Sequence, residues 1–269
     1  MAVDHYENFP VASILMPLRL RRPVALIYRF AREADDFADE GDFLPAQRLA
    51  LLNTFYRELD HVEAGQAPEI IWFSELAAVI REYGLPLQLF RDLLSAFSQD
   101  VIKDRYTDYT ELLDYCRRSA NPVGRLLLVL YGANTPQNNT WSDAICSSLQ
   151  LINFWQDVAI DHRKNRVYFP QDEMKRFGVT AADIANANTN GNWRDFMRFQ
   201  VNRTRQFLFS GAPLGRVLKG RLGLEMRMII AGGDRILSKM INVNYDIFRH
   251  RPVLKPHDWL LMFARSASL

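Results

Sequence analysis

Two stretches of the chain carry acidic side chains at helical spacing within otherwise apolar sequence. The first contains Asp35, Asp36 and Asp39, and the second, far downstream, contains Asp157 and Asp161. Residues four positions apart lie on one face of a helix, about 6 Å apart along its axis, so each stretch would form a row of carboxylates. Two such rows on facing helices could hold hard divalent cations around a diphosphate group.

Amide and basic side chains accompany both rows. Asn153 lies one helical turn before the second row, Arg32 lies one turn before the first, and Lys164 and Arg166 follow the second. Carboxylate and amide oxygens without Cys or His favour Mg²⁺ over zinc or iron. Because Arg and Lys donate readily to phosphate oxygens, the pattern predicts a Mg²⁺ site for a phosphorylated ligand.

The same acids could instead make ordinary surface salt bridges, since acidic and basic residues three or four positions apart commonly pair on exposed helices. The residues between the acids argue against this interpretation for both rows together. They include Phe37, Ala38, Val158 and Ile160. A solvent-exposed helix face is rarely this apolar, so ligand binding is the favoured interpretation.

The rest of the chain indicates an all-α protein, because apolar residues recur at three- and four-residue intervals almost throughout. Helices are predicted over residues 22–41, 45–63, 69–82, 86–103, 109–131, 142–162, 192–209, 213–243 and 256–264. Pro122 and Gly124 predict a kink or break inside residues 109–131. The connections are short and none resembles an interdomain linker, so residues 1–269 are expected to form one domain.

The composition argues against several other classes of protein. Lys and Arg total 33 against 31 acids, a balance that does not suit nucleic-acid binding. Cys116 and Cys146 lack a C-x-x-C spacing, which favours reduced thiols and a cytoplasmic location. No apolar run is long enough to span a bilayer, although residues 18–22 (LRLRR) could contact anionic headgroups at the inner face of a membrane.

With these residues in place, the chain resembles the squalene/phytoene synthases, a family of trans-isoprenyl diphosphate synthases. The residues matching the first signature of that family are Tyr28, Arg32, Asp35, Asp36 and Asp39. Those matching the second are Gln150, Asn153, Asp157, Asp161, Arg166 and Tyr168. The resemblance covers nearly the whole chain. It implies a single-domain, terpenoid-synthase-like helical bundle around a central apolar cavity, with Mg²⁺ held by Asp35, Asp39, Asn153, Asp157 and Asp161.

Within this family, residues 7–13, 115–124 and 244–254 are similar to the hydroxysqualene synthases of bacterial hopanoid biosynthesis. That resemblance implies a lyase that ionises presqualene diphosphate with Mg²⁺ and captures the rearranged cation with water, releasing hydroxysqualene and diphosphate. It implies two pathway partners, a synthase that makes presqualene diphosphate and a downstream oxidoreductase that acts on the product. The substrate-binding residues it implies are Phe9, Ser13, Arg32, Tyr115, Gln150, Lys164, Arg166, Tyr168 and Tyr245.

The fate of the cation depends on residues away from the rows. Aromatic faces stabilise positive charge, and the candidates are Phe9, Tyr28, Phe30, Phe154, Trp155 and Tyr245. Each of them could equally be a core residue. Asn121, beside the predicted break, could orient the attacking water, or it could simply tolerate the kink before Pro122.

Two other functions stay open. A sister enzyme would join two prenyl diphosphates head to head, giving presqualene diphosphate, squalene or a carotenoid precursor. Making squalene requires hydride from NADPH, and no NADPH is expected here, although helical squalene synthases bind the dinucleotide without a glycine-rich strand–helix motif. A non-catalytic assembly protein of the same fold ranks lower, because all five metal-facing positions are present.

Overall fold

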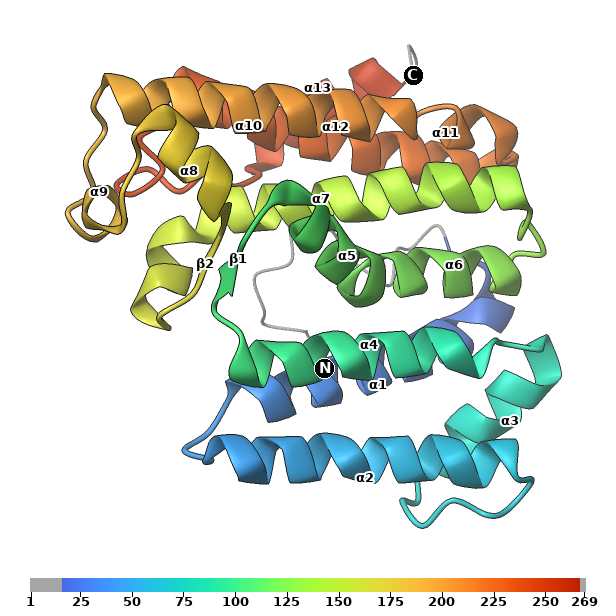
Figure 1. The fold of residues 1–269 in the computed structure, drawn as a ribbon. Coiled ribbons are helices and arrows are strands. Elements are labelled where there is room, and N and C mark those ends of the chain that lie inside the picture. Colours follow the sequence, from blue (N-terminus) through green and yellow to red (C-terminus); the bar gives the residue numbers. More distant parts are fainter. Residues whose placement is uncertain (1–15, 267–269) are drawn as a thin grey trace.

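A computed structural model describes residues 16–266, which are almost entirely helical (Figure 1). The first helices are α1 (Leu18–Asp39), α2 (Pro45–Glu63), α3 (Phe73–Tyr83), α4 (Leu87–Ile102), α5 (Tyr109–Ser119) and α6 (Asn121–Leu130). They are followed by α7 (Pro136–Arg163), α8 (Gln171–Phe177), α9 (Ala181–Ala185), α10 (Gly191–Ser210), α11 (Leu214–Val217), α12 (Gly220–Asn242) and α13 (Pro256–Ser266). Two short strands, β1 (Arg105–Tyr106) and β2 (Val167–Pro170), pair in parallel. The predicted Phe9 and Ser13 lie outside the described residues.

The long helices lie in layers, with α2 at one end, then α1 and α4, then α5 and α6, then α7, and α10 and α12 at the other end (Figure 1). The buried apolar side chains form two clusters, one around α1 to α4 and one around α7, α10 and α12. Helix α6 contributes Leu126 and Leu130 to the first cluster and Leu128 to the second. The helices that carry the two acid rows, α1 and α7, therefore belong to different clusters.

The start of α7 shows why one predicted boundary was wrong. The predicted helix begins at residue 142, but α7 already begins at Pro136. The Thr135 hydroxyl accepts a hydrogen bond from the backbone N–H of Asn138 at 3.1 Å, which is the arrangement of a helix N-cap. Proline is well suited to the next position because its missing N–H would have no intrahelical partner there.

The predicted break within residues 109–131 is confirmed. Helix α5 ends at Ser119 and α6 begins at Asn121, because Pro122 cannot supply the N–H that would continue α5. Gly124 then lets α6 approach α7 closely. A Cβ atom at this position would lie 2.4 Å from Ser142 Oγ and 2.6 Å from Cys146 Sγ.

Other boundaries also differ from the prediction. Helix α1 begins at Leu18, so Pro23 lies in its second turn and not in its first. The predicted helix over 213–243 is divided into α11 and α12, with Gly220 in the left-handed region at a φ of 63°. Helices α8 and α9 and both strands were not predicted. Between residues 16 and 266, no helix combines the length and apolar character needed to cross a membrane.

Candidate active site

The first acid row lies on one face of α1, toward the C-terminal end of that helix. Arg32 Nη2 lies 2.6 Å from Asp36 Oδ1, and Arg32 Nη1 lies 3.6 Å from Asp35 Oδ2. These are the three- and four-residue ion pairs that any exposed helix could form. Tyr28, one turn before Arg32, shares this face.

Asp39 joins the first row to the second. Arg166 Nη1 lies 2.6 Å from Asp39 Oδ1, and Lys164 Nζ donates to Asp39 Oδ2 at 3.2 Å. Both cations follow the end of α7, where Asn165 adopts a left-handed φ of 59° that asparagine tolerates. The Asn165 amide also donates to Asp104 Oδ2 at 3.0 Å. This turn therefore directs Lys164 and Arg166 at Asp39, a carboxylate of the first signature.

The second row follows α7 at three- and four-residue intervals, through Gln150, Asn153, Asp157 and Asp161, so these side chains share one face. Asn153 is exposed, whereas the other three are partly buried. Arg251 holds Asp157 with a bidentate pair, in which Nε donates to Oδ1 at 2.5 Å and Nη2 donates to Oδ2 at 3.1 Å. Asp157 therefore has a fixed orientation within the row.

Carboxyl groups in both rows have raised pKa values. Burial, followed by repulsion from Asp39, raises the pKa of Asp35 to about 6. Burial, followed by repulsion from Asp157, raises the pKa of Asp161 to about 7, and Asp39 of the opposite row contributes to this shift. The two rows therefore share one electrostatic environment. A cation placed between them would relieve the repulsion among the carboxylates.

The oxygen atoms of the rows fit a hard cation without forming a complete cage. Within residues 16–266, no three His, Cys, Asp or Glu side chains converge closely enough to enclose a metal ion. Asp36 Oδ1 and Asp39 Oδ1 lie close to arginine nitrogens, but neither oxygen accepts an aligned hydrogen bond. Because Mg²⁺ usually takes one or two carboxylates together with water and phosphate oxygens, this donor set suits Mg²⁺ bound with a diphosphate.

Tyr115 and Tyr168 form an aromatic group beside the rows. Phe154 stacks on Tyr168 with ring centroids 3.7 Å apart, and the Tyr115 ring lies 6.0 Å from each. The Tyr115 hydroxyl donates to Asp100 Oδ2 at 2.6 Å, and both residues are buried. Arg166 Nη2 donates to the Asp100 carbonyl oxygen at 2.9 Å. Asp100 therefore links two predicted site residues.

Asp100 and Arg251 are two residues of the site that were not predicted from the sequence. Asp100 lies on the buried side of α4, three residues after Phe97, and burial raises its pKa to about 7. An acid at a core-facing helical position was the signal available for it. Arg251 lies within residues 244–254, where only Tyr245 is predicted. Its partner Asp157 is 94 positions away, so no local spacing could reveal the pair.

Three of the predicted aromatic residues have other surroundings. The Tyr245 carbonyl accepts a hydrogen bond from Trp193 Nε1 at 3.0 Å, which places Tyr245 against α10. Trp155 is fully buried and donates to Thr204 Oγ1 at 2.9 Å. Phe30 is also fully buried, within the cluster around α1 to α4. Core packing accounts for Trp155 and Phe30.

An apolar cavity of about 220 Å³ lies between α6, α7 and α12. Its walls include Val123, Leu127, Ile145, Leu149, Leu222 and Met226. Continuing along α7 from Ile145 and Leu149, the next positions at four-residue intervals are Asn153 and Asp157. The cavity and the second acid row therefore follow one another on the same helix face. A ligand with its polar head at the rows could extend an apolar chain into this cavity.

Asn121 is buried at the start of α6, close to the cavity wall formed by Gly124. Ser147 Oγ donates to Asn121 Oδ1 at 2.8 Å. In this arrangement the amide oxygen of Asn121 faces Ser147. The amide nitrogen is thereby directed away from Ser147.

The fold and the joined acid rows define an all-helical protein of the terpenoid-synthase type. The squalene/phytoene synthase family model matches residues 2–258, and the chain belongs to this family of enzymes acting on prenyl diphosphates. The predicted family and fold class are confirmed.

Individual relatives agree with this assignment. The chain is 37% identical to a hydroxysqualene synthase of Rhodopseudomonas palustris over 95% of its own length and 86% of the relative. It is 34% identical to a hydroxysqualene synthase of Sinorhizobium fredii, over 97% of its own length and 87% of the relative. The solved squalene synthase HpnC from Alicyclobacillus acidocaldarius is 34% identical, with a TM-score of 0.82 and 90% of each chain covered.

Proposed function

We propose that this chain is a hydroxysqualene synthase, which ionises presqualene diphosphate and captures the resulting cation with water. The proposal depends chiefly on one observation: the acid rows are joined by Asp39 and Arg166 at one end of a helix face that continues into an apolar cavity. Such a site offers charged groups to a diphosphate and an apolar enclosure to a prenyl chain. Two of the relatives carry this name.

The basic residues of the site would bind the diphosphate. Lys164 and Arg166 both form ion pairs with Asp39. When a diphosphate binds, they could release Asp39 and donate to phosphate oxygens instead. Arg32 could do the same from α1, and Gln150 and Tyr168 could donate further hydrogen bonds. Mg²⁺ bound by Asp35, Asp39, Asn153, Asp157 and Asp161 would withdraw negative charge from the leaving diphosphate.

The apolar surroundings would protect the cation until water reaches it. Tyr115 and Tyr168 present aromatic faces that stabilise positive charge, and burial raises the pKa of both hydroxyls, so they stay neutral. The amide nitrogen of Asn121 could donate to the water oxygen and position it. Water capture needs no hydride, so no NADPH is included in the proposal.

The wider setting is part of the same proposal. The enzyme would work in the cytoplasm, at the inner face of the membrane, because its substrate and product are both strongly apolar. A preceding enzyme would supply presqualene diphosphate, and an oxidoreductase would consume the alcohol on the route to hopanoids.

Product analysis tests the reaction. Purified protein would be incubated with Mg²⁺ and either farnesyl or presqualene diphosphate, with and without NADPH, and the products identified by mass spectrometry. We expect hydroxysqualene from presqualene diphosphate without NADPH, and no product from Asp157→Asn. Asp42→Asn, at an exposed position between α1 and α2, is the matched control and should behave as the unmodified protein.

Head-to-head coupling is the second candidate, favoured by the name squalene synthase of the solved relative. Conversion of farnesyl diphosphate to presqualene diphosphate, or squalene formed only with NADPH, would replace our proposal with that function. An assembly protein ranks third. It would be supported if alanine at Asp35 or Asp157 left the biological activity of the chain unchanged.

A further inference from the structure

The C-terminal helix α13 exposes a dense group of large apolar side chains. Trp259, Leu260, Leu261 and Phe263 are exposed by 41%, 77%, 52% and 62% within five consecutive residues. Elsewhere in residues 16–266, large exposed apolar side chains occur singly or as one adjacent pair. Scattered apolar residues are normal on protein surfaces, whereas a concentrated group marks an interaction site.

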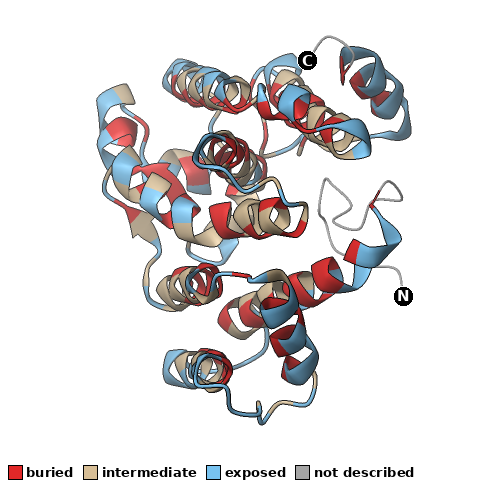
Figure 2. Cartoon of the chain, turned by 90° about the vertical axis from the view of Figure 1, so that its right-hand side faces the viewer, coloured by how far each residue is buried: buried red, intermediate tan, exposed pale blue. Residues whose placement is uncertain are grey.

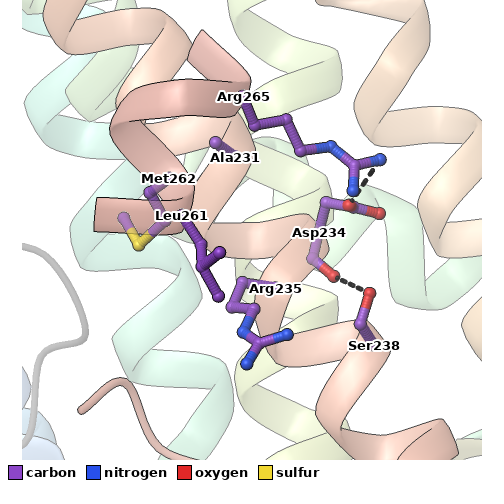
Figure 3. A pocket seen from close by; sticks show the side chains of 7 residues that line it. All are labelled: Ala231, Asp234, Arg235, Ser238, Leu261, Met262 and Arg265. Atoms are coloured by element: carbon purple, nitrogen blue, oxygen red, sulfur yellow. Dashed lines mark hydrogen bonds and ion pairs between the residues drawn. The ribbon is translucent and has the colours of Figure 1, made fainter. Parts of the chain in front are cut away.

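Ion pairs hold α13 to the protein from beneath. Asp258 is fully buried, with its oxygens 2.7 Å from Arg235 Nε and 2.5 Å from Lys239 Nζ on α12. Figure 3 shows Arg265 of α13 reaching Asp234 of α12, and Arg265 Nη2 lies 3.0 Å from Asp234 Oδ2. The helix therefore turns Asp258 inward together with Met262, and it turns its other large apolar side chains outward, whereas an ordinary surface helix exposes its charged residues.

The outward side of α13 is largely apolar, and His257 is the polar side chain that shares it. Trp259 and Phe263 lie one turn apart, and Leu260 lies beside them. Pro256 and Ala264 occupy the same side of the helix. A water-facing helix would place charged or polar residues at these positions.

Within residues 255–266, the exposed side chains that carry a permanent charge are basic. Lys255 precedes the helix and Arg265 lies in its last turn. The only acid of α13, Asp258, is buried and paired. Figure 2 places α13 and the exposed first turn of α1 on the same side of the molecule. That turn adds Leu18, which is 78% exposed, and basic neighbours.

We propose that α13 is an interfacial helix that docks on an anionic lipid bilayer. Its Trp, Leu and Phe side chains would enter the boundary between headgroups and acyl chains, and its basic flanks would contact anionic headgroups. A second copy of the chain fits less well. The four side chains expose on the order of 500 Å², below the roughly 800 Å² per partner of a standard protein interface.

Flotation with lipid vesicles tests the proposal without any substrate, so its outcome is independent of the proposed reaction. The full chain would be floated with phosphatidylcholine vesicles and with vesicles that also contain phosphatidylglycerol. We expect binding to the anionic vesicles that weakens with salt. The double variant Leu260→Gln/Phe263→Gln should partition at least tenfold less, whereas the control Ile71→Gln/Ile102→Gln, at exposed positions elsewhere, should bind as the unmodified protein.

Three results would overturn the inference. The unmodified protein could fail to bind either kind of vesicle, or the α13 double variant could bind as well as the control. Light scattering could instead show a dimer that the α13 double variant converts to a monomer, which would make this face an interface between copies. Unchanged circular dichroism and unchanged activity in detergent would establish that the variants are folded.

Discussion

Asp100 offers the sharpest test of the electrostatics around the candidate site. Burial raises the pKa of this carboxyl from its ordinary value of 3.8 to about 7. The folded protein therefore holds the proton of Asp100 more tightly than the unfolded chain does. The resulting contribution to stability is fully present below about pH 4 and is lost as the pH rises through 7.

The size of this effect follows from the shift. Each pKa unit corresponds to about 1.4 kcal/mol, so raising the pH from 5 to 8 removes about 3 kcal/mol of stability through Asp100 alone. The side-chain amide of asparagine does not titrate in this pH range. The Asp100→Asn variant keeps an oxygen that can accept a hydrogen bond from the Tyr115 hydroxyl. Its amide nitrogen would take the place of Asp100 Oδ1, which is buried without a hydrogen-bond partner.

The measurement is the free energy of unfolding in urea at pH 5, 6, 7 and 8, for the unmodified protein and Asp100→Asn. We expect the variant to gain about 3 kcal/mol relative to the unmodified protein across this range. Comparing the two proteins cancels the contributions of Asp35 and Asp161, which titrate in both. Parallel curves would refute the reasoning. Asp42→Asn, at an exposed position, should produce such a parallel curve.

Four further predictions follow from other contacts. Arg251→Ala removes both hydrogen bonds to Asp157 and should lower kcat/KM by about tenfold to a hundredfold, a loss of 1.4 to 2.7 kcal/mol; Arg251→Lys should restore only part of it. Gly124→Val should destabilise the fold by about 1–3 kcal/mol, measured by thermal unfolding, because its Cβ would lie 2.6 Å from Cys146 Sγ. Asp258→Ala leaves two cations without their partner under α13 and should lower the free energy of unfolding by about 3 kcal/mol. Mg²⁺ with inorganic diphosphate should raise the melting temperature, whereas chelation, or Asp157→Asn, should abolish that increase.

Local chemistry made several structural features predictable from the sequence. Pro122 correctly marked the end of α5, since proline cannot continue the hydrogen bonding of a helix. The start of α7 depends on equally local chemistry, because Thr135 caps the helix and Pro136 occupies its first position. The predicted helix nevertheless began only at residue 142. The two signatures likewise predicted that Asp39 and Arg166 belong to one site, and the two side chains form an ion pair.

Contacts between distant segments were not predictable in the same way. Helical spacing identifies which residues share a face, but it does not identify what that face meets. The four-residue interval places Asp157 in the row, but it does not predict that Arg251 pairs with Asp157. Asp100 and Tyr115 are both buried on different helices, and only the packing of α4 against α5 brings carboxyl and hydroxyl together.

The direction of Arg166 shows how a single residue outside any periodic pattern can determine a site. Helix α7 ends at Arg163, and a regular continuation would rotate Arg166 along the helix surface. Asn165 interrupts that rotation with its left-handed conformation, held by the Arg105 guanidinium on its carbonyl oxygen at 2.5 Å. The chain then enters β2, and Arg166 reaches both Asp39 and the Asp100 carbonyl. The meeting of the two acid rows therefore depends on this turn as much as on the acids themselves.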